Sequence, residues 1–382
     1  MSHYSIFEDF DGSIEDLFLL GEKYTFLAGA GISMDAPTNM PSARDIVRDL
    51  LTYCAPPEEV NNLLGLDGLR YELVVEKIQD IHDEDLKFMD YLEIVDLPNL
   101  IHFFLAHLIK MGHHVITTNF DYLIENALID ILPENLHFNI YPIITKEDFL
   151  SFQDPDILLN AGKYPIFKIH GSKRNFITGQ DTQDSLITTI SALGREREEG
   201  TTFAIEPYKK PAIYNLMKNR TLIVMGYSGS DDFDIGPMLK ELPFLSRLIW
   251  VEHTSSDQIT IRKVKPKGPI ENQNQISKLH EALAEIRSQG DIEVFLINVH
   301  TNIFIRDHLW SLLLPNTLFD ESKILKSDGE IPDFGQWIQP FYSNISLIEK
   351  YRFATDLFYN LKDVNAATRC TDKGLALAKQ EG

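Results

Sequence analysis

The stretch that decides the fold runs Tyr24-Thr25-Phe26-Leu27-Ala28-Gly29-Ala30-Gly31-Ile32-Ser33. Its first five residues form a short apolar run, which is typical of a buried strand. The glycines that follow predict a tight turn, after which a helix opens. A strand that turns sharply into a helix is the repeating unit of α/β sheets with parallel strands.

The same alternation continues outward along the chain. Further strands are predicted at His114–Thr117, Ile140–Ile144, Ile166–Ile169, Thr221–Met225, Arg247–Val251 and Glu293–Ile297. Helices are predicted between several of them, at Asn99–Met111, Ile213–Lys218, Asp234–Leu242, Ile276–Arg287 and Ile305–Leu314. This order predicts an α/β fold with a doubly wound, mostly parallel, Rossmann-like sheet. Doubly wound sheets bind ligands at the carboxyl ends of their strands. The polar stretch 256–275 is expected to be an exposed loop.

Two helical regions complete the predicted organisation. We expect a main domain over residues 1–322, with a small helical module at about 54–98 inside it. Residues 335–382 form an all-helical tail that resembles one tetratricopeptide-type helix pair. About three such repeats are needed for stability, so the tail is either the start of a longer repeat region that the chain cuts short, or a hairpin packed on the main domain.

Composition restricts the classes of partner. A net charge of −22 argues against a general nucleic-acid surface, which needs clustered Lys and Arg. The two cysteines, Cys54 and Cys370, exclude a disulfide framework and a four-cysteine zinc site, and they fit a reducing cytoplasm. No stretch reaches the roughly 18 to 20 apolar residues of a membrane span. We therefore expect a cytoplasmic protein.

The first chemical motif is the glycine turn itself. Glycines after a strand let the backbone approach a pyrophosphate, and a helix start offers unpaired N–H groups to an anion. The full dinucleotide fingerprint is incomplete, because its third glycine is replaced by Met34 and the acidic residue about 20 positions on is missing. A tight turn that binds nothing remains the alternative.

Three further strand ends carry polar residues. Asn119 and Asp121 follow the strand His114–Thr117, where an amide and a carboxylate two residues apart can face one site, although Asn also caps helices. His170, followed by Gly171, is placed for general-base work or for a structural hydrogen bond. The turn after Met225 contains Gly226, Ser228 and Ser230, whose hydroxyls suit ribose or phosphate oxygens, unless it is simply a flexible turn.

Taken together, the motifs GAGxS, TxNxD, HG and a Gly–Ser turn, in this order over about residues 20–320, resemble the sirtuin superfamily. Deacylase sirtuins carry a zinc on cysteine pairs after the HG motif, and here residues 172–208 contain no cysteine. The chain is therefore most similar in character to the zinc-free prokaryotic sirtuin-like NADases of anti-phage defence systems, which often join repeat or sensor domains.

This resemblance implies a catalytic domain that hydrolyses NAD to nicotinamide and ADP-ribose without zinc, depleting NAD in abortive infection. It implies that Asn119 positions a water or ribose hydroxyl, that His170 accepts a proton, and that Asp121 holds the nicotinamide carboxamide. The implied NAD-binding residues are Gly29, Ala30, Gly31, Ile32, Ser33, Thr118, Gly226, Ser228 and Ser230.

Two other functions stay open at this point. The chain could be an NAD-dependent protein deacylase, which the missing zinc module disfavours, or a sensor that binds NAD or ADP-ribose without turnover. In each case the expected partners are NAD and, through the helical tail, either further copies of the chain or a sensor protein.

Overall fold

The computed structural model describes residues 6–186, 205–229, 235–242, 245–256, 258–266, 277–320, 322 and 331–381. These residues form two compact units. The first unit contains the described residues up to Asn39 and those from Asp96 to 322; the second contains Met40–Val95 and the described residues from 331 onward. Among the described residues, none of the helices combines the length and apolar character that crossing a membrane requires.

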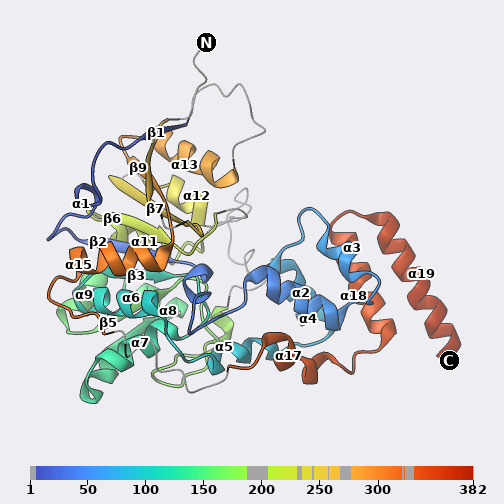
Figure 1. Cartoon of the computed structure of the whole chain (residues 1–382). Coiled ribbons are helices and arrows are strands. Elements are labelled where there is room, and N and C mark those ends of the chain that lie inside the picture. The colour runs from blue at the N-terminus through green and yellow to red at the C-terminus, as the bar shows by residue number, and fades with distance from the viewer. Residues whose placement is uncertain are drawn as a thin grey trace, which may run out of the picture. The chain divides into compact units, whose positions relative to one another are not determined.

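The first unit is built on one nine-stranded sheet (Figure 1). Its strands are β1 (Phe7–Asp9), β2 (Tyr24–Ala28), β3 (His114–Thr117), β4 (Ile140–Ile143), β5 (Tyr164–Lys168), β6 (Thr221–Met225), β7 (Arg247–His253), β8 (Thr260–Val264) and β9 (Glu293–Val299). Their order is β1-β8-β9-β7-β6-β2-β3-β5-β4, and all neighbours from β9 to β4 are parallel. The predicted α/β class with a mostly parallel sheet is confirmed.

Helices cover both faces of this sheet. The helices of this unit are α1 (Ile14–Leu17), η1 (Ala30–Ser33), α6 (Leu100–Lys110), α7 (Leu123–Ile131), η3 (Glu134–Asn139), α8 (Lys146–Ser151), α9 (Pro155–Asn160), η4 (Gln183–Ser185), α11 (Lys210–Met217), α12 (Ile235–Lys240), α13 (Lys278–Ser288), α14 (Thr301–Phe304), η6 (Ile305–Leu309) and α15 (Trp310–Leu313). Along β2, Phe26 packs in the core of α1, α6, α7 and α15, and Leu27 packs in the core of α8, α9, α11, α12 and α13. Because both faces are buried, the central strands are mostly apolar.

The strand order places the topological switch at β2. From β2 the chain first adds β3 on one side, and it later returns to add β6 on the other. Met225, Ala28, Thr117 and Lys168 lie in one row across β6, β2, β3 and β5. The loops that carry the four sequence motifs therefore begin at one level, along one edge of the sheet, where α/β sheets bind ligands.

One prediction about this sheet was wrong. Residues within the stretch expected to be an exposed loop form β8, which pairs antiparallel with β9 and with β1. Its sequence, Thr260-Ile261-Arg262-Lys263-Val264, is mostly polar and lies near the edge of the sheet, and only Val264 is buried. Backbone pairing, not an apolar run, makes this segment a strand.

The second unit joins two distant segments of the chain. Its helices are α2 (Ala43–Cys54), α3 (Val60–Leu64), α4 (Tyr71–Ile81), η2 (Lys87–Asp90), α5 (Tyr91–Ile94), α17 (Phe334–Tyr342), α18 (Leu347–Asn360) and α19 (Val364–Glu381). Ser42 caps α2, where its side chain accepts from the N–H of Asp45. Within this unit α17 contacts α2, and α18 contacts α4 (Figure 1).

Polar and aromatic contacts hold the two segments together. The hydroxyl of Tyr342 donates to the buried carboxylate of Asp83 at 2.6 Å. The rings of Tyr91 and Phe334 meet edge to face, with centroids 5.1 Å apart. Arg369 donates through Nε and Nη2 to both oxygens of Glu59, at 3.1 and 2.8 Å. The helical module and the helical tail therefore pack together as one compact unit.

Candidate functional site

The glycine turn after β2 packs against the turn after β6. The N–H of Gly31 donates to the carbonyl of Gly226 at 2.7 Å. A Cβ on Gly31 would lie 2.9 Å from the Gly226 Cα, and a Cβ on Gly226, whose φ is +64°, would lie 2.5 Å from the Ile32 nitrogen. These glycines are therefore needed for the close approach of two backbone turns at the switch point.

Most N–H groups of this turn already have partners. Gly29 donates to the carbonyl of Met225 at 3.0 Å, and Ile32 donates to that of Gly29 at 3.1 Å. Ala30 is exposed, and within the described part of the chain its N–H donates to no other group. An anion could therefore bind the Ala30 N–H without breaking a hydrogen bond, whereas the N–H groups of Gly29, Gly31 and Ile32 would have to exchange partners.

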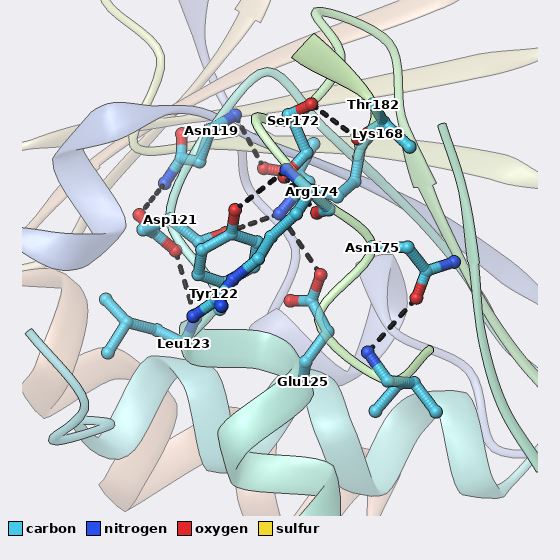
Figure 2. A network of polar contacts seen from close by, with 12 residues as sticks. Asn119, Asp121, Tyr122, Leu123, Glu125, Lys168, Ser172, Arg174, Asn175 and Thr182 are labelled. Atoms are coloured by element: carbon cyan, nitrogen blue, oxygen red, sulfur yellow. Dashed lines mark hydrogen bonds and ion pairs between the residues drawn. The ribbon is translucent and has the colours of Figure 1, made fainter. Parts of the chain in front are cut away.

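A buried polar cluster lies beside this turn, at the end of β3 (Figure 2). The Ser33 hydroxyl donates to Oδ2 of Asp121 at 2.9 Å, and the Asn119 amide donates to Ser33 Oγ and to Asp121 Oδ2, both at 3.2 Å. Oδ1 of Asp121 accepts from the Leu123 N–H at 3.2 Å. All three polar side chains are at least nine-tenths buried. The structure thus brings Ser33 of the glycine turn together with Asn119 and Asp121 of a second sequence motif.

The amide of Asn119 has one end held and one end unpaired. Because its nitrogen faces a carboxylate, which only accepts, the orientation of the amide is determined. Its Oδ1 is buried and has no hydrogen-bond partner among the described residues. Buried amide oxygens nearly always accept a hydrogen bond. Asn119 does not cap α7 either, because α7 begins at Leu123 with Tyr122 as its N-cap. The capping interpretation is therefore wrong.

His170 lies in the turn directly after β5 and is partly exposed. Its ring lies beside that of Phe120, with centroids 6.2 Å apart, so the loop after β5 reaches the loop that carries Asn119. Gly171 has a φ of +81°, and a Cβ there would lie 2.1 Å from the carbonyl oxygen of Ser185. Only glycine fits, so the position of His170 depends on this turn.

Two buried lysines support these loops. Lys168 donates from Nζ to the carbonyl of Asp121 and forms an ion pair with Glu125 at 3.1 Å (Figure 2). Burial raises the pKa of Glu125. Lys209 donates to the carbonyl of Ile169 at 2.6 Å and to Glu206 at 3.0 Å. Each lysine thus fixes the backbone next to a candidate site residue.

Other candidate residues take different positions. Thr118 is buried, and its N–H donates to the carbonyl of Ala28 at 3.1 Å. Ser228 is exposed in the turn after β6, followed by Gly229 with a φ of +61°. Ser230 lies outside the described residues.

A second group of polar residues follows β7 and β9 on the same edge. His253 Nδ1 lies 3.1 Å from the Thr301 hydroxyl, and Asn302 donates to Asp35 at 2.9 Å. Within the described residues, Thr254 Oγ1, His300 Nδ1 and Asn302 Oδ1 are buried polar atoms that have no hydrogen-bond partner. The sequence did not reveal this group, although each of its residues follows an apolar strand. Polar ligand atoms would satisfy these groups.

His102 is a further site residue that the sequence did not suggest. It sits in the first turn of α6, where its Nε2 lies 3.1 Å from Ser33 Oγ. Burial lowers the pKa of His102 to about 4 from 6.5, opposed by the charge of Asp121. The neutral ring is therefore the form present near neutral pH. The only sequence signal was a histidine inside an otherwise apolar helix face.

The buried histidines predict a loss of stability in acid. Burial, reinforced by the charge of Arg220, also lowers the pKa of His113 and His114 to about 4. In the unfolded chain each has a pKa of about 6.5, so the unfolded state binds more protons between these values. The free energy of unfolding should be constant above about pH 6.5 and fall toward pH 4, by up to about 3 kcal/mol per histidine.

Urea unfolding measured from pH 7 to pH 4 checks this expectation. His102→Gln and His113→Gln should each flatten the pH dependence, while His137→Gln, at a partly exposed position, should keep the wild-type slope. Equal slopes in all four proteins would contradict it.

Potential metal ligands do not cluster in the described part of the chain: no group of three or more His, Cys, Asp or Glu residues there could hold an ion. The segment after Gly171 forms a small turn that contains the bridge between Arg174 and Asp181. Its Ser172 hydroxyl donates to the carbonyl of Arg174, and Tyr122 Oη accepts from the Arg174 N–H at 3.2 Å (Figure 2). Hydrogen bonds thus hold Ser172 and Arg174 in place in this turn.

Comparison with known proteins adds one finding. The model of the SIR2-like domain family matches residues 113–244, which contain Asn119, Asp121, His170 and Gly226. No curated protein sequence matches the chain. Members of this family are commonly NAD-dependent enzymes, so the match supports the resemblance to the sirtuin-like superfamily and indicates an NAD-related activity in general terms.

Proposed function

We propose that this protein is an NAD glycohydrolase that cleaves the bond between nicotinamide and ribose. The observation that carries the proposal is the unpaired, buried Oδ1 of Asn119 at the switch point of the sheet. Since the amide nitrogen is held by Ser33 and Asp121, the oxygen can only accept, and a water or a ribose hydroxyl supplies the matching O–H.

In this proposal NAD lies along the carboxyl edge of the sheet. Its pyrophosphate meets the turn Gly29–Ser33, where the exposed Ala30 N–H is free to donate. Thr118 and the turn with Gly226 and Ser228 line the adjoining ribose. The unpaired polar atoms of Thr254, His300 and Asn302 support a further polar contact along the same edge.

The proposed reaction converts NAD and water into nicotinamide, ADP-ribose and a proton. Asn119 Oδ1 orients the attacking water at the anomeric carbon, and His170 accepts the proton that the water loses. The glycosidic bond breaks with its electron pair moving to the pyridinium nitrogen, so nicotinamide leaves neutral and needs no acid. The transition state resembles an oxocarbenium ion, as in other glycoside cleavages.

Asp121 takes a different proposed role from the one that the family resemblance implies. Three donors already occupy its carboxylate, which has about four acceptor positions. We propose that Asp121 mainly orients Asn119 and Ser33, with one position left for the nicotinamide carboxamide. Its negative charge also favours the developing positive charge of the ribose ring.

The decisive experiment incubates the purified chain with NAD, with and without an acetylated peptide, and measures nicotinamide and ADP-ribose by chromatography. Nicotinamide release without peptide, with label from ¹⁸O-water in ADP-ribose, supports hydrolysis. Release that requires peptide would indicate a deacylase, and NAD binding without any release would indicate a sensor. Equal rates with and without a strong chelator would support the proposal that no zinc takes part.

We also propose that the activity depletes NAD during anti-phage defence and is controlled by self-association or by a sensor protein. The family resemblance supports the first part. Exposed apolar side chains on α18 and α19, at Leu347, Tyr359, Val364 and Leu375, support the second. Cellular NAD after phage infection, and particle mass by light scattering, test the two parts separately.

A further inference from the structure

His102 forms hydrogen bonds through both ring nitrogens. Its Nδ1 accepts the backbone N–H of Asn99 at 3.1 Å, and its Nε2 lies 3.1 Å from Ser33 Oγ. The ring is completely buried. Asn99 itself is tied to the glycine turn, since its amide donates to the carbonyl of Ile32 at 2.8 Å. His102 is thus bound to both sides of the junction between α6 and the turn after β2.

These contacts determine which ring nitrogen carries the proton. A neutral imidazole has one N–H and one acceptor nitrogen. Because the Asn99 N–H can only donate, Nδ1 must be the acceptor, and the proton is on Nε2. The Nε2–H therefore donates to Ser33 Oγ. With that lone pair occupied, the Ser33 hydroxyl hydrogen is directed to its other neighbour, Oδ2 of Asp121.

The chain of hydrogen bonds thus runs in one direction, from Asn99 through His102 and Ser33 to Asp121. Ser33 Oγ also accepts from the Asn119 amide, so it donates once and accepts twice, which is its full capacity. With the opposite tautomer, Ser33 would donate to His102, and Asp121 would lose that donor. The Asn119 amide is held between the same two acceptors, so its orientation depends on this chain.

We propose that His102 is a positioning residue of the nucleotide site: through Ser33 and Asp121 it holds the Asn119 amide with Oδ1 free for the reacting water or hydroxyl. This inference rests on the proposed NAD glycohydrolase function. The hydrogen bonds of the His102 ring go to Asn99 and Ser33, so His102 acts on the Asn119 amide through Ser33.

Two substitutions separate positioning from a purely structural cap of α6. His102→Asn places an acceptor near the position of Nδ1, so the bond from the Asn99 N–H can persist, but it has no group that reaches Ser33. His102→Gln places an N–H near the position of Nε2, so the donor to Ser33 is restored. Positioning predicts that kcat falls about 10- to 100-fold in His102→Asn with little change in KM, and recovers largely in His102→Gln.

A double-mutant cycle with Ser33→Ala tests the route of the effect. If His102 acts through Ser33, His102→Asn should lower kcat much less in the Ser33→Ala background than in the wild type. Additive losses would overturn the inference, and so would wild-type kcat in a folded His102→Asn protein. Thermal unfolding of each variant supplies the control for folding.

The tautomer can be checked without any turnover. In ¹⁵N NMR spectra at pH 7, His102 should show a protonated Nε2 and an unprotonated Nδ1; the reverse assignment would overturn the inference. If the wild type releases no nicotinamide, the proposed function fails, and this spectrum decides the direction of the hydrogen-bond chain on its own.

Discussion

Replacing His170 or Asn119 with alanine should remove almost all nicotinamide release while the protein still folds and binds NAD. Loss of a general base costs a factor of about 10² to 10⁴ in rate. His170 is partly exposed, so its removal should leave stability nearly unchanged. Asn119 is buried and makes two side-chain hydrogen bonds, so its removal should also cost about 1 to 3 kcal/mol of unfolding free energy.

Nicotinamide release and thermal unfolding should be measured on the same samples, with His137→Ala as the matched control for His170→Ala. A stable His170→Ala protein with wild-type turnover would refute the proposed base. If Asn119→Ala lowered only stability, with turnover per folded molecule retained, the amide would be a structural residue and the proposed mechanism would lose its central group.

Replacing Lys168 with methionine should lower the free energy of unfolding more than replacing His170 or Asn119 with alanine does. The side chains of Lys168 and Glu125 are both buried, and their ion pair spans 3.1 Å. Removing one partner leaves the other charge buried without compensation, which costs about 3 to 5 kcal/mol. The Asp121 carbonyl loses its lysine donor as well, so NAD cleavage should also slow.

The double variant Lys168→Met/Glu125→Gln should recover much of the lost stability, because the uncompensated charge is gone. In the single variant the pKa of Glu125 lies above its unfolded value, so the folded state takes up a proton, and stability is lost as pH rises. In urea unfolding, the difference in unfolding free energy between Lys168→Met and the wild type should therefore shrink as the pH is lowered from 7 to 5. Lys210→Met, which breaks an exposed pair with Glu241, should cost at most about 1 kcal/mol.

Much of the sheet could be predicted from the sequence, for a local reason. Most central strands are apolar runs that end in a small or polar residue, as in Leu222–Gly226. Both faces of these strands are covered by helices, so their composition alone marks them. The same strand ends carry the site motifs, and parallel strands bring such ends to one edge. Four sequence motifs therefore indicated one site.

The residues that support the site could not be found in this way. Glu125 lies in an apolar helix and Lys168 in a buried strand, 43 positions apart, and only the fold makes them partners. His102 occupies a position where helical spacing predicts core packing. Its role depends on Ser33, which is 69 residues away in the chain. Pairings of this kind leave no periodic pattern in a single sequence.

The helical unit is built from two distant segments of the chain, and this has a consequence for folding during synthesis. Residues 40–95 are synthesised early, yet the surfaces on which they pack belong to residues 331 and beyond. At about 5 to 20 residues per second, the intervening segment takes about 10 to 50 seconds to appear. During that interval Phe88 and Tyr91 lack the ring of Phe334, and Asp83 lacks the hydroxyl of Tyr342. The nascent chain therefore carries an uncovered apolar surface until the residues from 331 onward emerge.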